Sequence, residues 1–133
     1  MAVDSKLKHL DLIQGIINRM AQNSFLLKGW SVTLTAAIFA LASRVDNNNF
    51  VVIAVFPAFM FWGLDAYFLR QERLFRCLYD KVRVMVPDEI DFSMKTDECI
   101  QDVDGWLKTA ISQTLGIFHG VVLATVFLVV LLI

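Results

Sequence analysis

Two long apolar segments dominate the first half of the chain. No charged residue occurs from Gly29 to Ser43 or from Asn47 to Leu64. Each segment reaches about 20 residues when Lys28 and Asp65 are included at its edge, which is the length a helix needs to cross a hydrocarbon core. The polar residues 44–49 between them end in consecutive asparagines, which tolerate the backbone of a tight reversal. The pattern predicts a transmembrane helical hairpin.

A third apolar run closes the sequence. Residues 109–133 contain no Asp, Glu, Lys or Arg, and about 25 residues are again enough for one crossing. An apolar share of 57% in 133 residues is too high for a soluble domain of this size. We therefore expect an all-α membrane protein that forms a single transmembrane domain, with three transmembrane helices at about 25–43, 50–69 and 111–133.

Lysine and arginine are distributed unevenly between the connecting segments. Four precede residue 29 and seven follow residue 69, whereas the hairpin turn carries only Arg44. Because positive residues remain in the cytoplasm, the N-terminus is expected inside and the C-terminus outside. Each tryptophan falls near the expected cytoplasmic end of a crossing, where an indole ring sits at the level of the lipid headgroups. These residues are Trp30, Trp62 and Trp106.

The segments that flank the crossings on the cytoplasmic side carry apolar residues at helical spacing among many charges. We expect helical extensions in the cytosol at about 5–24, 70–86 and 96–110, packed together as a cytosolic layer. One helix is expected to run from about Ser5 to Ser43; an amphipathic helix lying on the bilayer surface is the alternative for its first part. The residues of the cytosolic layer are Leu10, Ile13, Ile17, Met20, Phe75, Leu78, Val82, Met85, Ile100, Val103 and Leu107.

Prolines and acidic residues interrupt this helical pattern. Pro57 is expected to kink or loosen the second crossing, and Pro87 to end the cytosolic helix that follows it. Residues 87–104, here called the acidic segment, hold seven acidic residues and a single base, Lys95. A solvated turn, a metal site, or contact with basic residues of a neighbouring subunit would each fit this composition. The frame of a calcium-binding loop is missing.

The cysteines give no motif. Cys77 and Cys99 are the only cysteines, and they lack CxxC spacing. Buried or idle thiols are therefore expected, rather than a disulfide or a zinc site.

A few polar residues lie within or at the edge of the expected crossings. Lys28 and Asp65 sit at similar depth and are expected to pair across the hairpin, unless Lys28 reaches to the headgroups instead. His119 is expected to form a hydrogen bond with a neighbouring helix or to mark a functional site. The polar edge formed by Ser24, Lys28, Ser31 and Thr35 either faces a pore or packs against another helix.

Small residues recur at every fourth position of the third crossing. Ser112, Gly116, Gly120 and Ala124 form this line, which allows helix backbones to approach closely in lipid. The line would serve either packing within one subunit or contact between subunits.

Catalytic signals are absent from the sequence. There is no Gly-rich phosphate loop, no HExxH and no GxSxG. Neither His9 nor His119 follows an arginine at the spacing of the HEPN-type ribonuclease motif. We expect no enzyme activity, no cofactor and no bound metal. Nucleic-acid binding is not expected either, because Arg73, Arg76 and Arg83 alternate with acidic residues.

Two sequence runs carry a resemblance to a known family. The runs Asn23–Ser31 (NSFLLKGWS) and Leu64–Arg73 (LDAYFLRQER) resemble small bacterial inner-membrane proteins of the RipA type, and the likeness covers about residues 14–83. The resemblance implies a ring-like homo-oligomer, an octamer in this family, in the bacterial inner membrane. Membrane proteins that accompany some RNA-targeting CRISPR systems are similar in plan and act as pores, but they carry the HEPN-type motif that is missing here.

These observations give two expectations for function. The first is a homo-oligomeric inner-membrane protein that forms or gates a pore, in stress or phage defence. The alternative is a structural or scaffold membrane protein whose cytosolic helices recruit a cytosolic protein partner. The shortage of polar residues to line a pore, limited to Ser31, Thr35, His119 and Thr125, favours the scaffold or a lipid-filled ring.

Overall fold

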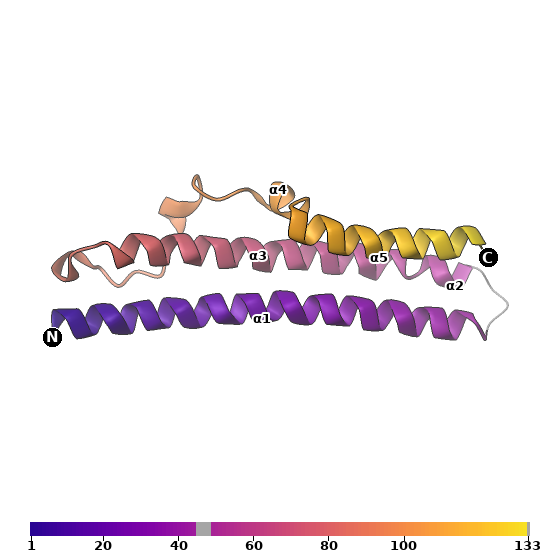
Figure 1. The fold of residues 1–133 in the computed structure, drawn as a ribbon, viewed down its shortest axis with the longest axis horizontal. Helices are drawn as coiled ribbons and strands as arrows, with labels where there is room; N and C mark the ends of the chain where they lie inside the picture. The colour runs from indigo at the N-terminus through magenta and orange to yellow at the C-terminus, as the bar shows by residue number, and fades with distance from the viewer. Residues whose placement is uncertain (45–48, 133) are drawn as a thin grey trace.

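The described part of the chain is all α-helical apart from connecting segments. The computed structural model describes residues 1–44 and 49–132; the middle of the expected hairpin turn, with Asn47 and Asn48, lies outside them. Figure 1 shows long helices that run side by side, with one irregular segment beside them. The elements are α1 (Ala2–Ala42), α2 (Asn49–Val52), α3 (Val55–Arg83), the 3₁₀ turns η1 (Pro87–Glu89) and η2 (Asp97–Cys99), α4 (Trp106–Ala110) and α5 (Gln113–Leu132).

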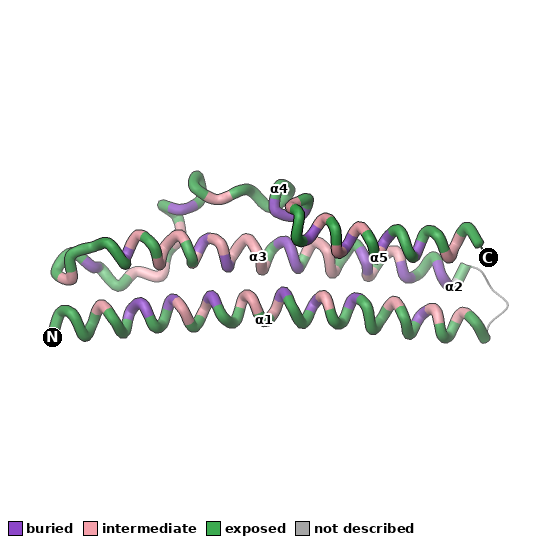
Figure 2. Tube along the Cα trace, viewed as in Figure 1, coloured by how far each residue is buried: buried purple, intermediate pink, exposed green. Residues whose placement is uncertain are grey.

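The first helix confirms the expectation of one continuous rod. α1 spans 41 residues without a break, or roughly 60 Å at 1.5 Å per residue, and it lies along α2 and α3 (Figure 1). Apart from the adjacent His9 and Leu10, its buried residues recur at spacings of three, four and seven, and they form the side that faces α3 (Figure 2). These residues are His9, Leu10, Ile13, Ile17, Ser24, Leu27, Ser31 and Ile38.

The second apolar segment is not one helix. α2 ends at Val52, and α3 begins after a break at Ile53 and Ala54, so the loosening expected near Pro57 is confirmed as a full interruption. Pro57 occupies the first turn of α3, where its missing N–H costs no intrahelical hydrogen bond. Only about ten residues of α3 precede Asp65, and this apolar stretch alone is too short to cross a membrane.

Among residues 1–44 and 49–132, two helices are long and apolar enough to cross a membrane by length and composition: α1 and α5. α1 and α5 run in the same direction, and α3 runs in the opposite direction (Figure 1). α3 contacts α1, α4 and α5, so it is the central element of the fold.

The cytosolic layer forms in part as expected. The apolar stripes of α1 and α3 bury one another within the chain, in a cluster of Leu10, Ile13, Ile17, Val82 and Ile90. Phe75, Leu78, Tyr79 and Met94 pack around it. Of the other expected members, Met20 is half-buried and Met85 is exposed. The charged half of α1 therefore has one buried side, against α3.

The third stripe of the layer was predicted wrongly. Residues 96–110 form only η2 and the short α4, and Ile100 and Leu107 are exposed while Val103 is half-buried. Aspartates and Gly105 are poor helix formers and break the periodic pattern. Ile90 and Met94, from the acidic segment, fill the position against α1 and α3 instead.

The expectation of two unpaired thiols was also wrong. Cys77 of α3 and Cys99 of η2 form a disulfide, with their Cα atoms 6.1 Å apart. The acidic segment folds back along α3 and brings Cys99 beside Cys77, 22 residues earlier. Sequence spacing alone gives no signal for such a pairing.

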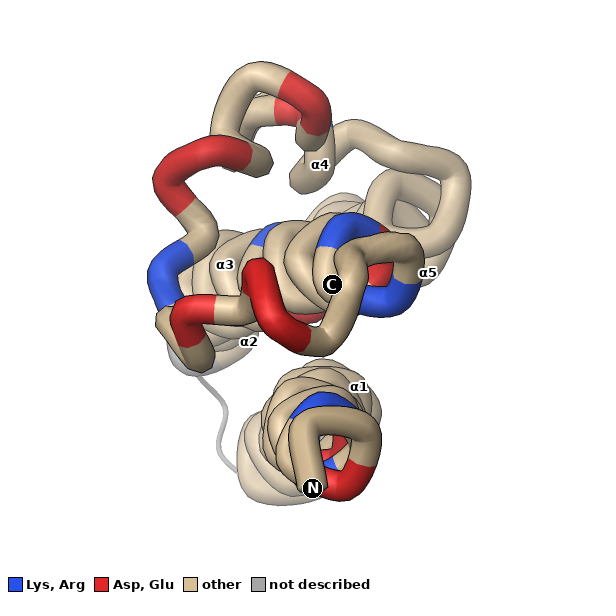
Figure 3. Tube along the Cα trace, turned by 90° about the vertical axis from the view of Figure 1, so that its left-hand side faces the viewer, with Lys and Arg blue, Asp and Glu red and all other residues tan. Residues whose placement is uncertain are grey.

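Figure 3 shows where the charges of the acidic segment lie. η1 packs beside α1, whereas η2 and α4 lie on the side of α3 away from α1 (Figures 1 and 3). Some acidic residues meet bases of the same chain: Lys81 Nζ is 3.2 Å from Asp102 Oδ2, and Lys108 Nζ is 3.7 Å from Asp104 Oδ1. Within residues 1–44 and 49–132, no group of three or more possible metal ligands occurs, so the metal-site alternative has no support.

Candidate functional site

A cluster of polar side chains joins three helices near the expected cytoplasmic edge of the membrane. Ser24 and Lys28 are one turn apart on α1, so their side chains lie on the same face. Asp65 comes from α3 and His119 from α5. Asp65 is fully buried, and Ser24 and His119 are almost fully buried. Here we call these four residues the inter-helix cluster.

Asp65 is the centre of the inter-helix cluster. Its Oδ2 lies 2.7 Å from Lys28 Nζ and 2.7 Å from His119 Nε2. Its Oδ1 accepts a hydrogen bond from the Ser24 hydroxyl, and Ser24 Oγ in turn accepts one from Lys28 Nζ at 2.8 Å. A buried carboxylate needs such partners, because an unpaired charge in the hydrocarbon region is very costly.

Aromatic rings close the inter-helix cluster on one side. The Trp62 ring stacks on the His119 imidazole, with centroids 5.9 Å apart and planes 9° from parallel. The Trp62 indole N–H donates to the Ala110 carbonyl at 2.8 Å, which ties α3 to α4. Trp106 makes the reverse link, since its indole donates to the Gly63 carbonyl at 3.0 Å. Two indole rings thus hold α3 and α4 together.

The expected Lys28–Asp65 pair is confirmed, and so is a hydrogen bond from His119 to a neighbouring helix. What the sequence did not reveal is that both interactions meet on one carboxylate, with Ser24 as a further partner. The spacing of Ser24 and Lys28 was the available signal. Nothing in the sequence shows that α5 approaches Asp65.

The inter-helix cluster contains serine, histidine and aspartate, but their arrangement differs from that of a catalytic triad. In a triad the serine donates to the histidine, and the histidine to the carboxylate. Here Ser24 and His119 both bind Asp65, and Lys28 occupies the same carboxylate. The arrangement is a charge-paired tie between three helices.

The other polar residues expected in the crossings lie outside the inter-helix cluster. Ser31 is buried, and its hydroxyl has no hydrogen-bond partner among the described residues. Thr35 of α1 and Thr125 of α5 line an apolar groove of about 290 Å³ between these helices. The Thr125 hydroxyl donates to the Val121 carbonyl at 2.8 Å, so its own helix satisfies it. The polar edge of α1 therefore packs against helices at Ser24, Lys28 and Ser31.

The line of small residues on α5 is not the buried face of that helix. Leu115, His119, Leu123 and Val126 are buried, whereas Ala124 is exposed and Ser112, Gly116 and Gly120 are half-buried. A Cβ atom at Gly120 would meet nothing within 4 Å. At Gly116 it would lie 3.2 Å from the Ile111 carbonyl oxygen, at the junction of α4 and α5. Close helix packing within one subunit is therefore not supported at Gly120, and contact between subunits stays a prediction.

Gly120→Leu tests that remaining role. We expect the subunit to stay folded, because the position has room and glycine is the poorer helix former by about 1 kcal/mol. If subunits meet at the small-residue line, the oligomer should dissociate, which native mass spectrometry in detergent would detect. Ala124→Leu, on the same line, is the matched variant. An unchanged subunit number in both variants would show that this line faces lipid.

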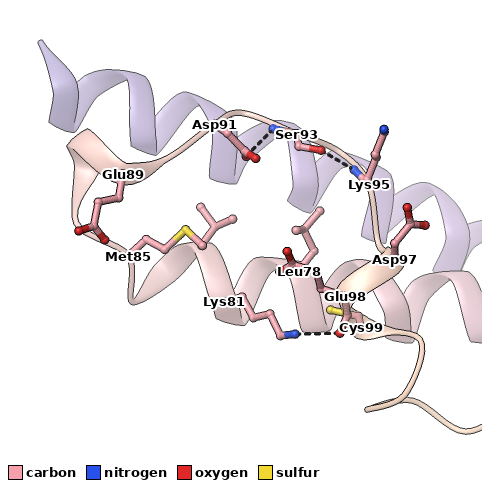
Figure 4. A pocket seen from close by; sticks show the side chains of 11 residues that line it. Leu78, Lys81, Met85, Glu89, Asp91, Ser93, Lys95, Asp97, Glu98 and Cys99 are labelled. Carbon is pink, nitrogen blue, oxygen red and sulfur yellow. Dashed lines mark hydrogen bonds between the residues drawn. The ribbon is translucent and has the colours of Figure 1, made fainter.

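A cavity with a polar rim lies under the acidic segment. Its volume is about 260 Å³, and it has an apolar floor on α3 and acidic residues around its rim (Figure 4). Leu78, Val82 and Met85 form the floor; Glu89, Asp91, Asp97 and Glu98 stand at the rim together with Lys81 and Lys95. Cys99 also lines it, so the disulfide borders the cavity.

Comparison with known proteins gives no relative. No protein-family model, no characterised protein and no solved structure matches the chain.

Proposed function

We propose that this chain is a subunit of a homo-oligomeric, three-pass inner-membrane protein that acts as a scaffold, with cytosolic helices that recruit a partner. The observation that carries the proposal is the one-sided packing of α1. Its buried residues face α3 (Figure 2), while large apolar side chains on its other sides remain exposed.

The third crossing is part of the proposal. α1 and α5 pass the length and composition criteria for crossing, and α3 lies against both. If both cross, the first part of α3 lies between them in the bilayer. Residues 49–69 rise roughly 31 Å at 1.5 Å per residue, which matches the hydrocarbon thickness despite the break before Val55.

The charged half of α1 carries an apolar patch that lipid cannot cover. Val3, Leu7 and Leu12 are 59%, 55% and 57% exposed. Leu7 and Leu12 line one shallow groove with Asp4, Lys8 and Asp11. Apolar side chains gathered among charges in a segment expected in the cytosol indicate a protein-binding surface. Here we call Leu7 and Leu12 the outer patch.

The two sides of the subunit differ, which favours a ring. The exposed side of α1 and the side that carries η2 and α4 lie on opposite sides of α3 (Figure 3). Contact between two unlike faces repeats head to tail and closes into a ring when the rotation allows. The resemblance to RipA-type proteins supports a ring of eight subunits.

A pore is the second candidate function. Thr35 and Thr125 both border the groove between α1 and α5, and a ring of subunits would repeat this pair around an axis. Against a polar channel, Ser31 and His119 are buried inside the subunit, and the groove is otherwise apolar. The scaffold is therefore the better supported function.

The outer patch gives the test. Leu7→Asp/Leu12→Asp should weaken assembly at least tenfold, or more than about 1.4 kcal/mol, because charges replace apolar contacts. The subunit number would be measured by native mass spectrometry across a dilution series in detergent. Asn18→Asp/Gln22→Asp, on exposed positions of the same helix, adds the same charge and should leave assembly unchanged.

Two results would contradict the proposal. A wild-type protein that is monomeric in detergent and in lipid nanodiscs would remove the homo-oligomer. Ion flux through liposomes that contain the wild-type protein would favour the pore over the scaffold.

A further inference from the structure

The acidic segment is attached to α3 mainly at its two ends. At its start, Ile90 is buried in the cluster of α1 and α3, and the Phe92 ring contacts His9 of α1 edge to face, with ring centroids 5.4 Å apart. At its end, the Asp104 carbonyl accepts a hydrogen bond from Arg70 Nε at 3.3 Å. Neighbouring Trp106 is held by its bond to Gly63.

Met94 packs against the cluster of α1 and α3, and residues 95–102 beyond it have two attachments to α3. One is the Cys77–Cys99 disulfide. The other is Lys81, whose Nζ donates to the Glu98 carbonyl at 3.0 Å (Figure 4) and lies 3.2 Å from Asp102 Oδ2. The Lys81–Asp102 pair is solvent-exposed on both sides, and such pairs contribute little. Repulsion among the acidic residues opposes the folded arrangement of the segment.

The expected topology places the disulfide on the side of the membrane where disulfides are unusual. The lysine and arginine distribution predicts that residues 70–108 face the cytoplasm. Thiol-reducing systems keep cytoplasmic cysteines reduced, so a disulfide there is typically transient or redox-sensing. The Cys77–Cys99 disulfide thus holds the part of the acidic segment that has the fewest other contacts. In a reducing compartment, such a bond could be broken and formed again, as a reversible switch requires.

We propose that the Cys77–Cys99 disulfide is a redox clasp. When it is oxidised, it holds the middle of the acidic segment over α3 and closes the cavity above Leu78, Val82 and Met85. When it is reduced, residues 95–102 move away from α3 and expose this apolar floor. The inference goes beyond the proposed function, and its test does not depend on oligomerisation.

The chemistry is a thiol–disulfide exchange with a cellular dithiol. Cys77 is half-buried and Cys99 is buried, so the attacking thiolate reaches Cys77 Sγ, and Cys99 leaves as a thiolate that takes up a proton. The second thiol of the dithiol then displaces Cys77 and completes its own disulfide. Two electrons and two protons pass to the protein. Hydrogen peroxide reverses the change by accepting two electrons and two protons and forming two molecules of water.

Cleavage by a protease specific for glutamate measures how far the acidic segment has opened. The chain contains three glutamates: Glu72 on α3, Glu89 near the anchored start of the acidic segment, and Glu98 beside Cys99. In the purified full chain, reduction with dithiothreitol should raise cleavage after Glu98 by about tenfold, because cleavage follows the population of the locally open state. Cleavage after Glu89 should change less than about threefold, because Ile90 stays buried.

Cysteine labelling provides the second measurement. In Cys77→Ser, Cys99 should react with a maleimide at a rate within about threefold of that in urea, since no disulfide holds η2. Lys81→Gln keeps the disulfide and serves as the matched control. Its cleavage after Glu98 should stay within about threefold of that of the oxidised wild type.

Three outcomes would overturn the clasp. Cys99 that stays protected in Cys77→Ser, together with unchanged cleavage after Glu98 on reduction, would show that packing alone holds the segment. Opening in Lys81→Gln as large as on reduction would make Lys81 the clasp. In growing cells, acid quenching followed by maleimide gel shift should show reduced thiols that pair after peroxide treatment; a disulfide retained throughout growth would show a structural bond.

Discussion

Lys28→Met is expected to destabilise the folded subunit by about 3–5 kcal/mol, the usual cost of removing one partner of a buried ion pair. The substitution leaves the Asp65 carboxylate fully buried, with Ser24 and His119 as its remaining partners. Unfolding in mixed detergent micelles, followed by circular dichroism, would measure the change.

The partner variant should have a smaller effect. Asp65→Leu removes the carboxylate, and the Lys28 side chain, which is 20% exposed, can then extend to the headgroups. Asp65 cannot reach water in the same way when Lys28 is removed. Asp65→Leu should therefore lower the free energy of unfolding less than Lys28→Met does.

The double variant supplies the sharpest comparison. Lys28→Met/Asp65→Leu replaces the ion pair with apolar side chains and should recover most of the stability lost in Lys28→Met, because no buried charge is left unpaired. If the double variant and Lys28→Met lost the same free energy of unfolding, the loss would come from the packing of the Lys28 side chain. The unpaired charge of Asp65 would then not be its cause.

The inter-helix cluster shows how far residue patterns predict a membrane site. Lys28 and Asp65 could be paired from their matching depth on either side of one turn, because a hairpin fixes which positions lie opposite each other. His119 is 54 residues from Asp65, and its position depends on how α4 breaks before α5. Only the folded chain brings these segments together.

The same reasoning explains the errors in the cytosolic part. The stripes of α1 and α3 were predictable because each helix is long and its apolar residues recur regularly. Within residues 96–110, Ile100, Val103 and Leu107 recur at similar spacing, but aspartates and Gly105 disfavour the helix that this spacing implied. Ile90 and Cys99, which the periodic pattern did not single out, are the residues that the acidic segment buries.

The cytosolic layer leads to the second large effect. Ile17 is 1% exposed and packs in the cluster with Val82 and Ile90. Ile17→Asp should cost about 4 kcal/mol or more, because it removes apolar packing and buries a charge that has no cation beside it in this cluster. The charged ends of α1 and α3 should separate, while the apolar half of α1 still inserts.

Leu12→Asp is the matched control for that variant. Leu12 lies on the same helix but on its exposed side, within the outer patch, so its substitution should change the free energy of unfolding by less than about 0.5 kcal/mol. Hydrogen exchange of the amides of residues 5–20 and 74–84 would follow local opening in both variants. Fast exchange in Ile17→Asp with normal exchange in Leu12→Asp would place the buried layer inside one subunit. If Leu12→Asp opened the layer equally, the exposed side of α1 would have to be part of the subunit core, and the outer patch could not be a free binding surface.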